Sequence, residues 1–232
     1  MKGFLIKRIK TFIGLKLMSF FVRYNYRLIT LANERMFEYP WVLTRCRFKG
    51  GRMADFGCRG SMLIPYFSSL GYEVYGIDLN EGLDSAFLKN YPNYRFIKAD
   101  MRKLPFNDNF FDISFSISTL EHIFSKDMVP QDKVALKEIF RTTKPGGQIL
   151  ITMPYGKGQL SKGHIGYPYK IYNRENLKEF LDMPDLGIEE IDYFIKKPPV
   201  WIKCSRQEIE DLDNTMETKG TVCISLVKKG II

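Results

Sequence analysis

Acidic residues stand in or at the end of three successive apolar runs in the first half of the chain. Asp55 lies within the first run, Asp78 ends the second, and Asp100 ends the third. Because the carboxyl ends of parallel strands meet at one edge of a sheet, we expect these carboxylates to share a ligand site. Gly57 and Gly60 follow the first run, where a glycine-bearing turn brings backbone N–H groups and a helix N-terminus to a ligand.

The spacing of the second and third acids indicates which ligand groups they serve. Asp78 follows Gly57 by about twenty residues, the spacing at which an acid accepts hydrogen bonds from ribose hydroxyls. Asp100 is placed to accept a hydrogen bond from an adenine amine, with Leu79 and Met101 in apolar contact with the ring. NAD enzymes and methyltransferases both bind ribose in this way, so Asp78 does not distinguish between them.

Asp55 does distinguish between the two cofactors. It occupies the place of the first glycine in the dinucleotide turn G-x-G-x-x-G. A dinucleotide would set its anionic pyrophosphate over this turn, where a carboxylate would repel it. S-adenosylmethionine has no phosphate and carries an ammonium and a sulfonium group, so an acid is compatible with it. The turn therefore favours S-adenosylmethionine as the cofactor.

The two histidines of the chain are the candidate general bases. His122 follows Glu121 just beyond the fourth apolar run, which ends at Ser118, and His164 lies in a glycine-rich loop after the fifth. Histidine titrates near neutral pH, which suits a base that takes a proton from an acceptor hydroxyl. A capping or packing role for His122 and an exposed loop position for His164 are the alternatives. The spacing of histidines and cysteines predicts no metal site.

Strand-like and helix-like runs alternate from residue 52 onward, a pattern typical of an α/β protein with a mostly parallel sheet. A Lys-Pro-Gly-Gly turn is expected at 144–147, and the last two strands are expected to form an antiparallel pair separated by a polar excursion. The expected strands are 53–57, 73–79, 95–100, 111–118, 148–153, 188–195 and 222–227, and the expected helices are 61–70, 82–89, 131–143 and 174–181.

The basic character of the chain belongs to its beginning. Of a net charge of +9 over 232 residues, residues 1–33 contribute +7 and contain no acid, so the remainder carries only +2. A nearly neutral body does not indicate a broad phosphate-binding face. The four cysteines lie far apart, which predicts a reduced, cytoplasmic protein. No uncharged apolar run reaches the roughly 18 residues that would span a bilayer.

The segment 1–48 is basic and aromatic, and residues 4–22 have the periodicity of an imperfect amphipathic helix. Three roles are open for it. It could pack on its own domain with solvated lysines, form a lid over a substrate pocket, or contact an anionic membrane surface through residues 1–30.

Together, these motifs resemble those of the class I S-adenosylmethionine-dependent methyltransferases. The resemblance covers about residues 50–155 and is greatest to the small-molecule branch that includes the ubiquinone-biosynthesis type. It implies a Rossmann-like, doubly wound, seven-stranded, mostly parallel sheet with one antiparallel strand and helices on both faces. The chain then divides into the helical segment 1–48 and a cofactor-binding domain, 49–232. The implied cofactor-binding residues are Asp55, Gly57, Cys58, Gly60, Asp78, Leu79, Asp100, Met101 and Ser118.

The activity implied is in-line transfer of a methyl group to a small-molecule acceptor of lipid, quinone or glycan type. One alternative is a nucleic-acid methyltransferase, but such enzymes hold a flipped base with an Asn/Asp-Pro-Pro-aromatic element where residues 118–121 read Ser-Thr-Leu-Glu. A second is an inactive, cofactor-binding partner subunit, because Arg59 and Ser61 stand where the family usually has glycines. The oligomeric state is open.

Overall fold

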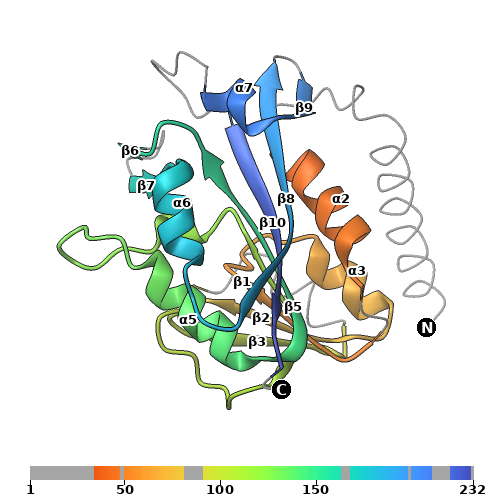
Figure 1. The fold of residues 1–232 in the computed structure, drawn as a ribbon. Coiled ribbons are helices and arrows are strands. Elements are labelled where there is room, and N and C mark those ends of the chain that lie inside the picture. Colours follow the sequence, from red (N-terminus) through yellow and green to blue (C-terminus); the bar gives the residue numbers. More distant parts are fainter. Residues whose placement is uncertain are drawn as a thin grey trace.

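The fold is built on one eight-stranded sheet in the computed structural model (Figure 1). The structure describes residues 34–47, 50–80, 91–162, 168–197, 200–210 and 220–230. A separate two-stranded sheet pairs β6 (Leu160–Lys162) with β7 (Pro168–Lys170). The strands of the main sheet are β1 Arg52–Phe56, β2 Glu73–Asp78, β3 Tyr94–Lys98, β4 Phe111–Ile117, β5 Thr143–Tyr155, β8 Leu186–Lys197, β9 Val200–Cys204 and β10 Gly220–Lys228.

The strand order is β3-β2-β1-β4-β5-β10-β8-β9. Strands β1 to β5 pair in parallel, and β10 runs antiparallel to both β5 and β8. The mostly parallel sheet and the antiparallel pair predicted at its end are therefore confirmed. The sheet has one strand more than the seven predicted, because β9 pairs antiparallel with β8 within the stretch expected to be a polar excursion. Trp201 explains this strand, since its side chain is 2% exposed and packs against Phe37.

Helices cover both faces of the sheet, as predicted. The side chains of α2 and α3 form one buried apolar cluster, and those of α5 and α6 belong to another on the opposite face. The helix predicted at 82–89 and the amphipathic segment 4–22 lie outside the described residues. The helices are α2 Arg35–Arg45, α3 Leu63–Ser69, α5 Asp132–Thr142, α6 Arg174–Leu181, α7 Arg206–Glu210 and the 3₁₀ helix η1 Leu120–His122.

A buried polar contact holds helix α2 against strand β8. The Trp41 indole donates a hydrogen bond of 2.9 Å to Asp192 on β8, and the Arg45 guanidinium lies 2.8 Å from the same carboxylate. Phe37 stacks on Phe194 with ring centroids 4.6 Å apart. Aromatic and charge-assisted contacts of this kind fix the direction of the helix across the sheet.

The turn predicted at 144–147 lies inside β5 rather than before it. Phe111 of β4 pairs with Thr143, but Ile113 pairs with Gln148, so the four residues between form a bulge in a continuous strand. Gly146 has a φ of +76°, the left-handed conformation that glycine adopts without steric cost. The prediction of a turn at these residues was therefore correct, but the turn is a bulge inside β5 and not a connection before it.

No helix within the described ranges is both long and apolar enough to cross a membrane. All four cysteines are free thiols. Membrane contact through residues 1–30 and a cytoplasmic location stay predictions, since the first segment lies outside the described residues.

Candidate functional site

The turn after β1 is joined to the end of β2 by backbone hydrogen bonds. Strand β1 lies between β2 and β4, which places its carboxyl end at the centre of the parallel part of the sheet. The N–H groups of Gly57 and Cys58 both donate to the Ile77 carbonyl oxygen, at 2.8 and 3.3 Å. Asp55 and Asp78 are thereby held at the carboxyl ends of neighbouring strands, as the sequence predicts.

Two features of the turn require a glycine at position 57. Its φ is +75°, and a Cβ atom built on it would lie 2.2 Å from the Thr119 side chain. Gly60 also has a positive φ, of +71°, but a Cβ atom there would meet nothing within 4 Å among the described residues. The turn thus packs tightly against Thr119, just after β4, through Gly57, whereas the described residues leave open space at Gly60.

Gly57→Ala is expected to destabilise the protein by about 2–5 kcal/mol, since left-handed backbone costs about 1–2 kcal/mol and overpacking about 1–3 kcal/mol. Gly60→Ala is the matched control, with the same backbone strain and no clash, and should cost only about 1–2 kcal/mol. Urea unfolding of both variants measures the difference. Equal losses would show that the contact with Thr119 is not a constraint.

Asp78 presents its carboxylate over the glycine turn. Its Oδ2 accepts the backbone N–H of Arg59 at 3.3 Å, and its Oδ1 accepts that of Asn80 at 3.0 Å. Each carboxylate oxygen can accept more than one hydrogen bond, so both retain capacity for a ligand hydroxyl. Leu79 beside it is 54% exposed, and Arg59 is exposed. The hydrogen bond from the Arg59 backbone orients the Asp78 carboxylate, while the Arg59 side chain extends into solvent.

Asp100 is engaged by Arg102. The Arg102 guanidinium lies 3.0 Å from each Asp100 oxygen through Nε, and the Arg102 backbone N–H donates to Oδ1 at 2.9 Å. These hydrogen bonds lower the pKa of Asp100. Arg102 also donates to the Phe124 carbonyl, which ties this turn to the segment after η1. Met101 is buried in the core at 5% exposure. A contact of this turn with adenine stays a prediction.

Asp55 is a buried carboxyl with an unsatisfied oxygen. Its side chain is 3% exposed, and Oδ2 has no hydrogen-bond partner among the described residues. Burial raises its pKa to about 6, a hydrogen bond from Ser61 and the positive charge of Arg35 lower it, and the charge of Asp78 raises it further. Buried polar atoms in folded proteins nearly always have a partner, so Oδ2 marks a place for a ligand donor.

Glu38 reaches the same edge from helix α2, and sequence reasoning did not identify it. Its side chain is fully buried, and Oε1 accepts hydrogen bonds from the hydroxyls of Ser118 and Thr152, both at 2.7 Å. Oε2 accepts from the Arg35 guanidinium at 2.5 Å. The signal available was an acid embedded in the apolar, aromatic run 37–42. Ser118 itself has a φ of +43°, a strained conformation of the kind found at functional sites.

Glu121 is a second buried acid at the end of β4. Its side chain is 2% exposed, and Oε2 has no hydrogen-bond partner among the described residues. Burial raises its pKa to about 8, against which the backbone hydrogen bond and the Arg35 charge act, while Glu38 raises it further. The buried carboxyls of Asp55, Glu38 and Glu121 thus all interact with the positive charge of Arg35. Glu121 is more easily protonated than Asp55.

His122 lies at the surface of this cluster. Its side chain is about half exposed, Nδ1 is 3.3 Å from the Pro168 carbonyl oxygen, and Nε2 is 3.9 Å from Glu121 Oε1. Partial burial lowers its pKa. Because a carbonyl oxygen can only accept, Nδ1 carries the proton in this hydrogen bond, and Nε2 of the neutral ring is free to accept one. His164 lies outside the described residues. In the described part of the chain, no cluster of acids, histidines and cysteines could hold a metal ion.

Comparison with known proteins identifies relatives. A family model described as a methyltransferase domain matches residues 54–151. A ubiquinone biosynthesis O-methyltransferase from Pseudomonas fluorescens (strain SBW25) is 30% identical over 180 residues, covering 74% of this chain and 71% of that protein. Phosphoethanolamine N-methyltransferase 2 from Caenorhabditis elegans is 32% identical over 146 residues, covering 59% of this chain. The chain spans only 25–40% of the length of that enzyme and three further relatives.

Two solved structures share the fold. Haemonchus contortus phosphoethanolamine N-methyltransferase 2 matches with a TM-score of 0.60 and 19% identity, covering 92% of this chain and 57% of that one. Burkholderia thailandensis 1,6-didemethyltoxoflavin-N1-methyltransferase matches with a TM-score of 0.58 and 18% identity, covering 77% and 71%. At such identities these likenesses show the fold alone, and the relationship itself rests on the P. fluorescens enzyme. The chain belongs to the class I S-adenosylmethionine-dependent methyltransferase family.

Proposed function

We propose that this chain transfers a methyl group from S-adenosylmethionine to a small-molecule acceptor. The observation that carries the proposal is the pair of carboxylates at the ends of β1 and β2. Asp55 Oδ2 is buried and has no partner in the part of the chain that the structure describes, and no described atom would meet a Cβ at Gly60 beside it. Relatives named for ubiquinone biosynthesis and for phosphoethanolamine methylation support this acceptor class. The proposed cofactor-binding residues are those predicted from the sequence: Asp55, Gly57, Cys58, Gly60, Asp78, Leu79, Asp100, Met101 and Ser118.

The residues present fit this cofactor. Asp55, with a pKa of about 6, is largely ionised at neutral pH and can accept from an ammonium group through Oδ2. Asp78 has acceptor capacity for two ribose hydroxyls. When bound, the cofactor supplies a methyl group already activated by its sulfonium. The protein then has to position donor and acceptor and exclude water.

His122 is the group that can take a proton from the acceptor, and the buried carboxyl of Glu121 lies 3.9 Å from its ring. The neutral His122 ring has Nε2 available as an acceptor and is accessible from solvent. Glu121, with a pKa of about 8, is largely protonated and therefore neutral at pH 7, so it adds little negative charge beside the His122 ring. We propose His122 as the direct base and Glu121 as the buried group that sets the charge around it. A role for His164 stays a prediction.

Helix α2 supports a capping role for the segment 1–48. It brings Glu38 and Arg35 to the ends of β4 and β5, and Glu38 bonds the strained Ser118. The last part of the segment therefore closes over the edge at which we place the cofactor. Of the three roles open for this segment, the contacts of α2 favour packing on its own domain together with a lid.

Asp78→Ala tests the proposed ribose contact. The loss of charge-assisted hydrogen bonds worth roughly 1.5–3 kcal/mol should weaken S-adenosylmethionine binding about tenfold or more. S-adenosylhomocysteine should be affected equally, because the two share the ribose. The matched control is Asp108→Ala, an exposed acid paired with Arg141 before β4, which should leave both affinities unchanged. Calorimetric titration measures all four constants, and an unchanged affinity for Asp78→Ala would contradict the assignment.

A further inference from the structure

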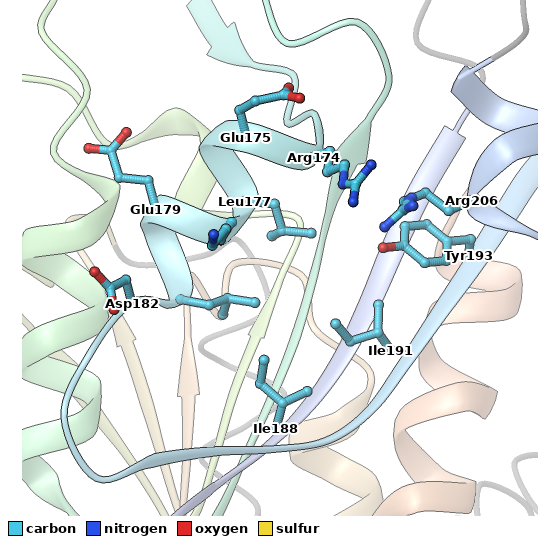
Figure 2. Close-up of a pocket in the computed structure, with 11 residues that line it drawn as sticks. Arg174, Glu175, Leu177, Glu179, Asp182, Ile188, Ile191, Tyr193 and Arg206 are labelled. Atoms are coloured by element: carbon cyan, nitrogen blue, oxygen red, sulfur yellow. The ribbon is translucent and has the colours of Figure 1, made fainter.

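A cavity of about 770 Å³ lies between helix α6, strand β8 and the start of α7 (Figure 2), and none of the residues assigned above to the cofactor or acceptor lines it. Strand β8 is four strand spacings from β1 in the sheet, about 19 Å away. The volume is within the range of roughly 300–1,000 Å³ of small-molecule sites. The cavity is therefore separate from the cofactor edge.

The walls of the cavity are apolar because of a bulge in β8. Glu190 pairs with Ser225 and Ile188 pairs with Leu226, so β8 carries one extra residue at this point. An extra residue reverses the alternation of side chains and puts Ile188 on the same face as Ile191. Figure 2 shows both isoleucines pointing into the space next to Leu177 of α6. Ile188 remains 52% exposed, which makes it one of the large apolar side chains that the fold leaves uncovered.

One end of the cavity is positively charged. The guanidinium groups of Arg174 and Arg206 face one another beside the Tyr193 ring (Figure 2). Arg206 is held by Glu210, whose Oε1 lies 3.2 Å from its Nε, while Arg174 has no ion-pair partner within the described ranges. Glu210 offsets the charge of Arg206, so this end keeps one positive charge, that of Arg174, without a counter-charge among the described residues. Planar guanidinium groups bind carboxylate and phosphate well.

The acids that line the cavity do not neutralise this end. Glu179 extends from the outer side of α6, and Asp182 lies at the opposite end of the cavity (Figure 2). Glu175 extends from the first turn of α6 on the side of Arg174, but within the described ranges it forms no ion pair with either arginine. The cavity therefore combines a cationic end with an apolar wall formed by α6 and β8. That is the complement of a ligand with an anionic head and one hydrocarbon chain.

We propose that this cavity is a binding site for a single-chain anionic amphiphile. The carboxylate or phosphate head lies between Arg174 and Arg206, and the chain lies against Leu177, Ile188 and Ile191. The site is independent of the cofactor edge, so this ligand is a second ligand and not the methyl acceptor. A fatty acid and an alkyl phosphate share the required chemistry, and the test distinguishes them.

Calorimetric titration of the full chain, below micelle-forming concentrations, uses dodecanoate, dodecyl phosphate, octanoate and dodecanol as probes. We expect saturable binding of one molecule of dodecanoate or dodecyl phosphate, and the tighter of the two identifies the head group. Dodecanol should bind at least about tenfold more weakly, because the charge-assisted hydrogen bonds are lost. Affinity should rise up to about fourfold for each methylene between octanoate and dodecanoate. Equal binding of dodecanol, or no binding by either anion, would overturn the proposal.

Three variants locate the binding. Arg174→Ala should weaken dodecanoate about tenfold and leave dodecanol unchanged, whereas Lys137→Ala, an exposed lysine on α5, controls for overall charge and should change neither. Ile188→Glu should abolish binding of both without unfolding the protein, because this side chain is already half exposed. Saturating dodecanoate should leave S-adenosylmethionine affinity unchanged. Binding that survives Ile188→Glu, or that competes with S-adenosylmethionine, would refute a separate site here.

Discussion

Glu121→Gln is expected to stabilise the folded protein at pH 8 by up to about 4 kcal/mol, because burial raises the pKa of Glu121 from 4.5 to about 8. The folded state binds this proton more tightly than the unfolded state does. Below pH 4.5 Glu121 is protonated in both the folded and the unfolded state, so its ionisation does not change the free energy of unfolding. As the pH rises from 4.5 to 8, only the unfolded state ionises freely, so the wild type loses stability throughout this range. Glutamine does not titrate and avoids the loss.

Urea unfolding at pH 5 and at pH 8.5 measures this effect. The difference between Glu121→Gln and the wild type should be small at pH 5 and should grow by several kcal/mol at pH 8.5. Glu138→Gln is the control of opposite sign, because hydrogen bonds from Arg141 lower the pKa of Glu138. That variant should lose stability by a similar amount at both pH values. A Glu121→Gln effect independent of pH would show that Glu121 is ionised in the folded protein.

Glu38→Ala is expected to cost about 3–5 kcal/mol, because two hydroxyls lose their acceptor at about 1–3 kcal/mol each and the partly exposed Arg35 loses its counter-charge. It leaves the Arg35 guanidinium without its 2.5 Å partner and the hydroxyls of Ser118 and Thr152 without their acceptor. It also removes the contact that holds α2 against the ends of β4 and β5. We therefore expect weaker S-adenosylmethionine binding as well as a lower free energy of unfolding.

Glu38→Gln separates charge from hydrogen bonding. The amide oxygen can still accept from both hydroxyls, so the expected loss is only about 1–3 kcal/mol, for the missing charge opposite Arg35. Chemical unfolding gives both stabilities, and titration with S-adenosylhomocysteine tests the site in the folded variants. A loss of less than 1 kcal/mol for Glu38→Ala, with unchanged S-adenosylhomocysteine binding, would mean that the hydrogen bonds of Glu38 contribute little to stability or to the site.

The sequence predicts the parallel half of this fold because local signals there agree with the tertiary structure. Four of the five parallel strands lie within about two residues of their expected ranges, and β5 begins earlier because the predicted turn is a bulge inside it. Asp55 and Asp78 could be placed at one edge because carboxyl ends of parallel strands meet there. Helix α6 could be predicted from its periodicity, and its limits agree with the prediction.

What sequence reasoning missed depends on contacts between distant parts of the chain. Glu38 and Thr152 are 114 residues apart, and no local pattern links a helix in the N-terminal segment to the ends of β4 and β5. Strand β9 forms because Trp201 has a buried place against Phe37, which only the packed fold provides. The burial that makes Glu121 a distinctive group likewise follows from what covers it and not from its neighbours in sequence.

Calorimetric titration of the purified chain with S-adenosylmethionine, S-adenosylhomocysteine and NAD tests the central claim most directly. The carboxylates at the ends of β1 and β2 predict saturable binding of the first two, at one site per chain. They also predict no binding of NAD, whose pyrophosphate would meet Asp55 over the glycine turn. Binding of NAD, or of neither methyl-cycle ligand, would contradict the assignment of this edge to S-adenosylmethionine.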